Sequence, residues 1–328
     1  MSEVSTEPYQ REVNPPICLP KLQGQPTTPE VLLKAMQIIR AVESALQDAY
    51  VEGRFEGPLH VSLGQEEAAV GIVAGMGTED VLISNHRGHG HALAFGLDPQ
   101  QVVGEIVGDP CGYGSGRGGS MHIFAPQQGF LGTNGIVGDG AGLGVGAALA
   151  LRQNRRGAVA VAIFGDGAMA TGIVSESFNL ASLWSLPIVF VCENNGYAEM
   201  TPTSVHLSSP PSSRAEAFGL RVAHVEEGSD PQSVAKAVRA AVEHARHGKP
   251  CFVEIVTYRW GGHYVGDPAI YRPSSEGETW RKKHDPILQL GIRLGKTESE
   301  IEEQNKQYLR SAQELVLGIL SHAHRSEH

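Results

Sequence analysis

Short apolar runs alternate with longer amphipathic segments along the second half of the chain. Four such runs occupy residues 158–164, 187–193, 221–226 and 250–259. Their length and lack of polar alternation are typical of strands buried on both faces. Residues 170–184 and 230–248 lie between them and have apolar positions at helical spacing. This alternation predicts an α/β fold with a mostly parallel sheet and helices on both faces.

The first half of the chain predicts three helices and an extended arm. A helix should begin with Thr28 as cap and Pro29 in its first turn, a second should span residues 65–76, and a small-residue helix should cover 140–152. Residues 1–28 are Pro-rich and aperiodic, which indicates an arm. The chain therefore divides into this arm, an α/β domain over 29–275, and a charged helical segment over 276–328 that ends in a long helix.

Composition and charge narrow the class of protein. The 328 residues carry a formal net charge of -10, which argues against general binding to nucleic acid or anionic membrane surfaces. No apolar run approaches the roughly 20 residues that span a bilayer. The four cysteines form no CxxC pair, and the N-terminus has no signal-peptide or transit-peptide pattern. We therefore expect a cytoplasmic protein that acts on a small-molecule substrate.

Two of the predicted strands end in polar residues at similar positions. Asp166 follows the run at 158–164, and Asn194 and Asn195 follow the run at 187–193. If the strands are neighbours, a carboxylate and amide oxygens meet at one sheet edge, which suits Mg²⁺ and a diphosphate. Gly165 and Gly167 would let the diphosphate approach the backbone. The alternative is an Asp helix cap and an ordinary Asn-Gly turn.

The stretch from Gly165 to Tyr197 resembles the thiamine-diphosphate motif. It is most similar to the alpha chain of the decarboxylating first component of 2-oxo acid dehydrogenase complexes, and the resemblance covers roughly residues 50–275. It implies a thiamin-diphosphate-binding fold with thiamine diphosphate and Mg²⁺ as cofactors. The implied metal ligands are Asp166, Asn195 and the backbone oxygen of Tyr197. The implied diphosphate site lies along Gly165, Asp166, Gly167 and Ala168.

Further motifs of this family follow in the same order. The segment at 57–71 resembles its His-containing loop, which implies that His60 faces the active-site channel. The segment at 84–96 resembles its diphosphate-binding Tyr-Arg-x-His-Gly stretch, with Arg87 as the contact and His86 in place of the Tyr. The GGSMH sequence at 118–122 is also similar to a signature of the family.

The last two motifs concern the cofactor ring and the acyl acceptor. Residues 132–138 match the Gly-Ile-Val stretch, which implies that Gly135 and Val137 meet the aminopyrimidine. Residues 257–272 match a loop whose His, here His263, borders both cofactor and acyl acceptor and moves protons or stabilises charge. The GGHYVGDP sequence at 261–268 looks more like acetoin-cleaving members than pyruvate enzymes. Pyruvate or branched-chain 2-oxo acids stay open as substrates.

The resemblance also implies partners. The carboxylic acid that such enzymes need beside the cofactor ring nitrogen belongs to the beta chain. We therefore expect an oxidoreductase that is active only with a beta subunit, in a two-alpha two-beta heterotetramer. Its acyl acceptor would be a lipoyl acyltransferase component.

Two alternatives from other classes of protein remain, and one group of nearby histidines needs an interpretation. Gly142, Gly144 and Ala147 form a variant of the dinucleotide fingerprint, which would suggest an NAD-dependent oxidoreductase, although no clear strand precedes it. A small-residue helix packed closely against a partner is the favoured interpretation. A non-catalytic regulatory chain is disfavoured because Asp166, Asn195, Arg87 and His263 are all present. The histidines at 86, 89 and 91 are interpreted as a polar loop around a phosphate rather than a metal cluster.

Overall fold

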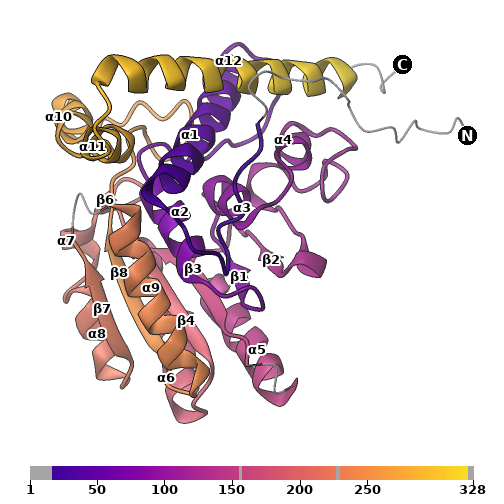
Figure 1. The fold of residues 1–328 in the computed structure, drawn as a ribbon. Helices are drawn as coiled ribbons and strands as arrows, with labels where there is room; N and C mark the ends of the chain where they lie inside the picture. The colour runs from indigo at the N-terminus through magenta and orange to yellow at the C-terminus, as the bar shows by residue number, and fades with distance from the viewer. Residues whose placement is uncertain (1–16, 155–156, 227–229, 324–328) are drawn as a thin grey trace, which may run out of the picture.

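A computed structural model describes residues 17–154, 157–226 and 230–323. Its centre is a six-stranded sheet with the order β2-β1-β3-β4-β8-β7, in which every pair of neighbours is parallel (Figure 1). The strands are β1 (Val81–Ile83), β2 (Phe130–Gly132), β3 (Ala160–Gly165), β4 (Ile188–Asn194), β7 (Arg221–Val225) and β8 (Cys251–Val256). The four apolar runs of the second half are therefore four adjacent strands of one parallel sheet.

Helices cover both faces of this sheet, as predicted. One face carries α1 (Pro29–Val51), α2 (Glu66–Gly75) and α9 (Pro231–Arg246), and the other carries α5 (Asp139–Asn154), α6 (Gly172–Leu183) and α8 (Pro211–Ala217). The alternation along β3 separates two cores. Val161 and Ile163 pack in the core under α1, α2 and α9, whereas Ala160 and Ala162 pack in the core under α5 and α6.

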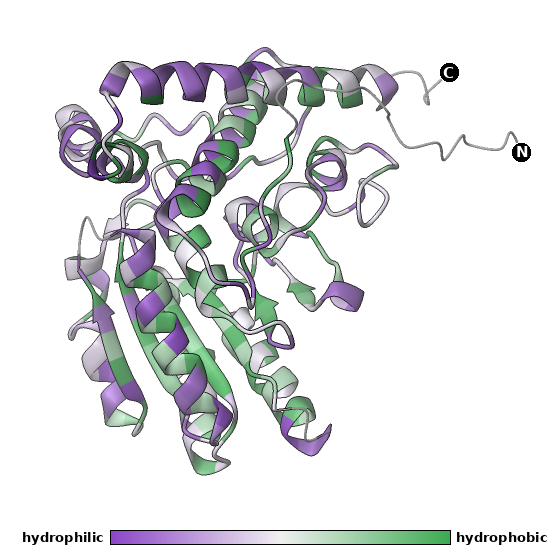
Figure 2. Cartoon of the chain, in the orientation of Figure 1, coloured by the Kyte–Doolittle hydropathy of each residue, from purple (hydrophilic) through white to green (hydrophobic). Residues whose placement is uncertain are grey.

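Helix α9 begins where the sequence supplies a helix cap and a proline. In α9 the Asp230 carboxylate accepts hydrogen bonds from the backbone N–H groups of Gln232 and Ser233, and Pro231 fills the first turn. One side of α9 is apolar and faces the sheet, while its outer side is polar (Figure 2). Burial of the apolar stripe therefore fixes this helix across β4, β7 and β8.

The N-terminal and C-terminal helices pack together beside the sheet. Thr28 caps α1, as predicted, by accepting a hydrogen bond from the N–H of Val31 at 3.5 Å. The long α12 (Glu298–Ala323) crosses α1 at the top of Figure 1, next to α10 (Ser274–His284) and α11 (Pro286–Arg293). Because apolar residues of α12 belong to the same core as α1, the C-terminal helices stabilise the α/β unit directly. Residues 1–16 of the predicted arm lie outside the described residues.

Several short elements were not predicted. They are β1, β2, the helices α3 (His89–Phe95), α4 (Pro99–Val107), α7 (Thr203–His206) and α8, the small hairpin of β5 (Tyr197–Ala198) and β6 (Thr201–Pro202), and three short 3-10 helices at Gly119–Met121, Pro126–Gln128 and Asp166–Ala170. Most lie in the glycine-rich stretches or directly after strand ends, where the repeat of apolar residues is too short to indicate a helix or a strand. Across the described residues, every helix is too short or too polar to span a bilayer.

Candidate active site

One cavity of about 290 Å³ lies at the carboxyl ends of β3 and β4. Every residue that the sequence predicted for the site lines it: His60, His86, Arg87, Gly135, Val137, Gly165, Asp166, Gly167, Ala168, Asn195, Tyr197 and His263. These residues come from segments between His60 and His263. The fold therefore brings side chains from separate sequence motifs together around one cavity.

Asp166 lies at the end of β3, where the strand gives way to a short 3-10 helix. Its side chain is 1% exposed, accepts a hydrogen bond from the hydroxyl of Thr203, and has the Nε2 atom of His206 at 3.6 Å from Oδ2. Burial raises the pKa of this carboxyl above its usual range. Gly165 occupies the cap position of this helix, and Asp166 is its first residue. The expected Asp helix cap is therefore not found here.

Asn195 reaches the cavity from the neighbouring strand. In the register of β3 and β4, Gly165 pairs with Glu193, so Asp166 and Asn195 emerge at the same edge. The Nδ2 group of Asn195 donates to Gln65 at 3.1 Å, and its Oδ1 atom accepts from the N–H of Tyr197 at 3.2 Å. Asn194 instead donates to Glu254 at 2.8 Å and does not line the cavity. Asn195 is thus the amide that can contact a ligand in the cavity. The expected turn is also present, because Asn195 accepts a hydrogen bond from the N–H of Tyr197 two residues later.

The glycines next to Asp166 differ in what surrounds them. A side chain at Gly167 would meet the Cβ atom of Ala198 at 2.8 Å, so close packing against β5 requires glycine there. A side chain at Gly165 would have only the carbonyl oxygen of Glu193 near it, at 3.9 Å. Gly165 therefore leaves space beside the backbone at the cavity. Next to Gly135, the side chains of Ile136 and Val137 form part of the cavity rim and are 70% and 58% exposed.

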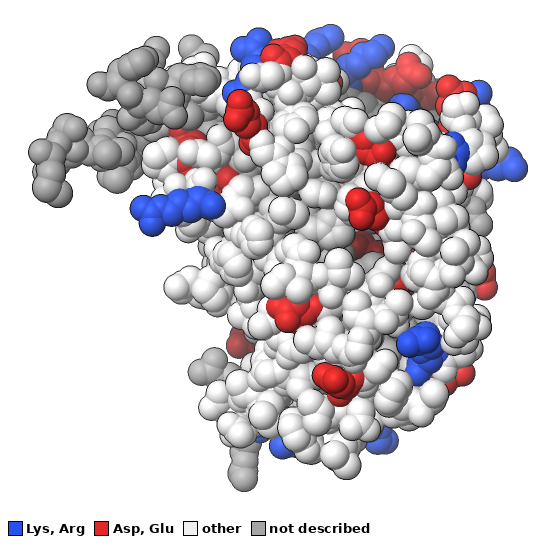
Figure 3. Space-filling view, turned by 180° about the vertical axis from the view of Figure 1, so that it is seen from behind, with Lys and Arg blue, Asp and Glu red and all other residues white. Residues whose placement is uncertain are grey.

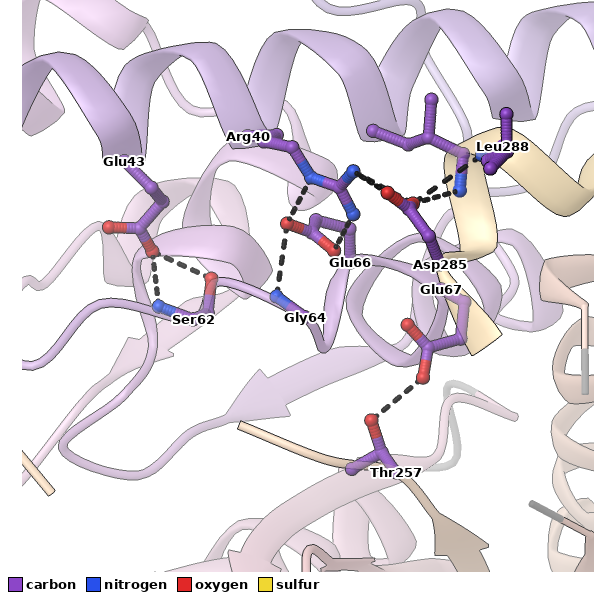
Figure 4. A network of polar contacts seen from close by, with 10 residues as sticks. Arg40, Glu43, Ser62, Gly64, Glu66, Glu67, Thr257, Asp285 and Leu288 are labelled. Carbon is purple, nitrogen blue, oxygen red and sulfur yellow. Dashed lines mark hydrogen bonds and ion pairs between the residues drawn. The ribbon is translucent and has the colours of Figure 1, made fainter. Parts of the chain in front are cut away.

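The loop that carries His60 is held by buried carboxylates from two helices. Glu43 of α1 accepts hydrogen bonds from the N–H and hydroxyl of Ser62 at 2.9 and 2.6 Å, and Glu66 of α2 accepts from the N–H of Gly64 at 3.2 Å (Figure 4). Arg40 pairs with Glu66 at 2.8 Å and also with Asp285 (Figure 4). The backbone at 59–64 is thus fixed, and the position of His60 with it.

Three histidine rings from three loops form a compact group at the cavity. Ring centroids lie 4.9 Å apart for His60 and His86, 5.0 Å for His60 and His263, and 5.3 Å for His86 and His263. The Nδ1 atoms of His60 and His263 are buried and have no hydrogen-bond partner in the described structure. Burial and the nearby Arg87 lower the pKa of His60 to about 3 and that of His263 to about 4. These rings are therefore neutral at physiological pH.

Arg87 joins two of these loops. Its terminal amino groups donate to the carbonyl oxygens of Val61 at 2.6 Å and His263 at 2.7 Å. The side chain is only 4% exposed, and burial together with the charge of Arg259 lowers its pKa to about 10. Arg259 also lines the cavity. Two guanidinium groups thus face the same space, which suits an anionic ligand such as a diphosphate.

Comparison with known proteins identifies the family. Residues 34–327 match the model of the dehydrogenase E1 component. The alpha subunit of the pyruvate dehydrogenase E1 component from Rhizobium meliloti (strain 1021) is 39% identical over 86% of this chain and 82% of its own length. The alpha subunit of acetoin:2,6-dichlorophenolindophenol oxidoreductase from Bacillus subtilis (strain 168) is 39% identical over 81% of each chain. The chain belongs to the dehydrogenase E1 component family. The resemblance seen in the sequence is confirmed, and with it the expected dependence on thiamine diphosphate.

Membership of the E1 family removes the dinucleotide alternative, and the fold gives the physical reason. The helix α5 that contains Gly142 and Gly144 does not follow directly on a strand, since β2 ends seven residues before it. Gly144 instead allows α5 to pack on the sheet, because a side chain there would meet the Cβ atom of Ala162 at 2.8 Å. Close packing of the small-residue helix is thus observed within the chain itself.

One prediction about the histidines is wrong. His89 and His91 do not lie in a polar loop but on helix α3, where both are buried. The Nδ1 atom of His89 is 3.0 Å from Glu43, and the Nε2 atom of His91 is 3.0 Å from Glu193. Their carboxylate partners are far away in the sequence, so the spacing of the histidines alone could not reveal this role.

Sequence reasoning also missed residues of this E1 cavity. Gln65, Glu193 and Arg259 all line it, and Glu193 accepts a hydrogen bond from Asn85 at 3.3 Å. A signal was available for two of them. Glu193 and Arg259 both lie at the carboxyl end of a predicted strand, which is where ligands bind in parallel sheets.

Proposed function

We propose that this chain is the alpha subunit of a thiamine-diphosphate- and Mg²⁺-dependent E1 component that cleaves acetoin and passes the acyl group to a lipoyl acceptor. The observation that carries the proposal is the meeting of Asp166, Asn195 and Tyr197 with the histidine loops around one cavity. The alternative is the same role with pyruvate or a branched-chain 2-oxo acid. The cytoplasmic location stays a prediction.

The residues present fit the proposed cofactors. A buried carboxylate at Asp166, an amide oxygen at Asn195 and the carbonyl of Tyr197 are hard oxygen donors, as Mg²⁺ prefers. Few protein ligands leave coordination positions for water and diphosphate oxygens. The space beside Gly165 and the guanidinium of Arg87 would then accommodate the diphosphate.

The remaining side chains suggest how the reaction is supported. Bound thiamine diphosphate supplies a carbon nucleophile and an electron sink for breaking the bond beside the substrate carbonyl. His60 and His263 are neutral because their pKa values lie far below 7, so each ring can donate one hydrogen bond and accept another. Such rings can stabilise a developing negative charge on the substrate oxygen and move a proton at the acyl acceptor.

Exposed apolar side chains at the cavity rim support a protein partner. Ile136 and Val137 line the cavity and are 70% and 58% exposed, and Leu143 on the following helix α5 is 53% exposed. Much of the face seen in Figure 3 also lacks charged side chains. We propose that the beta subunit covers the rim and supplies the carboxylic acid that completes the site, in a two-alpha two-beta assembly.

The preference for acetoin comes from the loop after β8. His263 is followed by Tyr264 and by a Gly-Asp-Pro turn, as expected for acetoin-cleaving members. The Asp267 carboxylate accepts hydrogen bonds from the N–H of His263 at 2.6 Å and the hydroxyl of Tyr271 at 2.8 Å. Asp267 therefore fixes the backbone of His263. The acetoin-named relative from Bacillus subtilis agrees with this choice.

The test is co-expression of this chain with the product of the neighbouring open reading frame. The purified complex is assayed with acetoin, pyruvate and branched 2-oxo acids, with a dye acceptor or lipoamide, and with each cofactor present or omitted. We expect turnover of acetoin only when both chains, thiamine diphosphate and Mg²⁺ are present. Turnover by the purified alpha chain alone would contradict the partner proposal, and faster turnover of pyruvate would favour the alternative.

A further inference from the structure

The histidine group at the cavity has a geometry that its proposed role does not require. His60, His86 and His263 each offer one ring nitrogen, and these atoms lie within 4.8 Å of one another. The three rings form a nearly equilateral triangle, with centroid separations from 4.9 to 5.3 Å. We propose that these three residues form a transition-metal site that binds Zn²⁺ or a similar divalent ion and leaves one coordination position open to the cavity.

The ring positions match what such an ion needs. A Zn–N bond is about 2.0–2.1 Å long and an imidazole nitrogen lies about 1.1 Å from its ring centre, so tetrahedral ligation places the centroids roughly 5.2 Å apart. The observed separations of 4.9, 5.0 and 5.3 Å already agree with that value. The nitrogens, which lie within 4.8 Å of one another, must approach to roughly 3.4 Å when the ion binds.

Two of the three rings have a nitrogen atom that is available to a ligand. His60 is only 6% exposed, yet its Nδ1 atom and that of His263 are buried without a hydrogen-bond partner in the described structure. A buried polar atom without a partner normally costs free energy, so a ligand at this position would stabilise the fold. Neutral imidazole is the form that binds metal, and both rings are neutral at physiological pH.

The charges around the group permit a cation. The cavity wall carries the guanidinium groups of Arg87 and Arg259, which repel a metal ion. It also carries the carboxyl groups of Glu193 and Glu199, besides Asp166 of the proposed Mg²⁺ site, and these offset the two guanidinium charges. Arg87 is directed at two backbone carbonyl oxygens and not at the rings. We therefore expect binding that is specific but weaker than at a structural zinc site.

The ligand type separates this site from the proposed Mg²⁺ site. Imidazole nitrogen suits Zn²⁺, whereas the carboxylate and amide oxygens of Asp166 and Asn195 suit Mg²⁺. Excess Mg²⁺ should therefore occupy the oxygen ligands and leave the histidines to Zn²⁺. The inference concerns ion binding alone, so it can fail or hold whatever the substrate of the enzyme is.

The experiment is titration of the full-length chain with Zn²⁺ in the presence of excess Mg²⁺, followed by calorimetry. X-ray absorption at the zinc edge reports the ligands, and Co²⁺ substitution reports a tetrahedral site by its visible bands. We expect one ion per chain, with three imidazole ligands. His86→Phe should weaken binding about tenfold or more, since one of three protein ligands is lost.

The matched control is His244→Phe, the same substitution at a histidine on α9 outside the cavity, which should leave Zn²⁺ affinity unchanged. His86→Tyr is a second variant in case the first folds poorly. Asp166→Asn should retain Zn²⁺ binding. The proposal is overturned if the wild-type chain binds no Zn²⁺, if its absorption spectrum shows only oxygen ligands, or if the His86 and His244 variants bind equally well.

Discussion

At the ends of β3 and β4 the cavity presents oxygen atoms, whereas the loops around it present ring nitrogens and guanidinium groups. The oxygen side is Asp166, Asn195 and Tyr197, and the nitrogen side is His60, His86, Arg87, Arg259 and His263. The first arises from two adjacent strands in register. The second comes from loops that are distant in the chain and meet only through tertiary contacts. One half of the site is therefore set by the sheet, and the other by how well the loops are held.

The oxygen side should have the largest effect on cofactor binding. We expect Asp166→Asn to lower the affinity for thiamine diphosphate with Mg²⁺ by about a hundredfold or more, because the only carboxylate of the ligand set is lost. The melting temperature of the chain without cofactor should not fall, since burial raises the pKa of Asp166 and its charge opposes folding. Calorimetric titration and thermal unfolding measure both.

The adjacent amides provide a control for this prediction. Asn195 lines the cavity, but Asn194 donates to Glu254 on β8. Asn195→Ala should therefore weaken cofactor binding, and Asn194→Ala should not. Equal losses in the two variants would mean that the turn as a whole, rather than one amide oxygen, determines the affinity.

The nitrogen side should affect individual steps of the reaction. In the complex with a beta chain, we expect His263→Ala to lower acyl transfer to lipoamide about tenfold or more beyond its effect on dye-linked oxidation. The reason is that His263 lies on the loop where the acyl acceptor would arrive. Steady-state assays with the two acceptors measure the difference. Equal losses would favour a contact to diphosphate only.

The loops of the nitrogen side depend on buried anchors. Glu43 is fully buried and accepts hydrogen bonds from Ser62, with His89 also in contact. We expect Glu43→Gln to lower the free energy of unfolding by about 3 kcal/mol, because a buried charged partner is lost. Urea denaturation measures this value. Glu302→Gln, at an exposed position of α12, is the matched control and should change stability by less than about 0.5 kcal/mol.

The two sides also differ in how far sequence reasoning could reach. Asp166 and Asn195 follow buried strands directly, so the rule that ligands bind at strand ends was enough to place them together. His60 and His263 carry no such local signal and were assigned only through resemblance to a family. The anchors were missed altogether, since Glu43 meets His89 across 46 residues and His91 meets Glu193 across 102.

The fold follows the same division. The strands β3, β4, β7 and β8 and the helices α1, α2, α6, α9 and α12 were predicted because each has a long hydrophobic period or a cap. The strands β1 and β2 have only three residues each and lie among glycines and polar residues. β1 pairs with β3, and β2 pairs with β1. These contacts join segments that are distant in the chain, so no local pattern could indicate them.

Protonation of His60 and His263 should have the smallest of these effects on stability. It is also the most direct test of the nitrogen side. The pKa values of about 3 for His60 and about 4 for His263 lie below the ordinary value of 6.5. Below about pH 6.5 the unfolded chain therefore binds protons that the folded chain does not, and stability falls as the pH decreases towards these values. Above that pH both states are neutral at these positions, and the histidines make no difference.

Other buried groups titrate in the opposite sense, so the test must use a difference between variants. Burial raises the pKa of Glu67 to about 8, and this group costs stability as the pH rises. We expect His60→Phe to lose less stability than the wild-type chain when the pH is lowered from about 7 to about 5, as measured by urea unfolding at both values. If both proteins lose the same amount, the pKa of His60 in the folded chain equals its ordinary value of 6.5 rather than about 3. Burial would then not keep the ring neutral, and His60 would change charge close to neutral pH instead of acting only as a neutral hydrogen-bonding group.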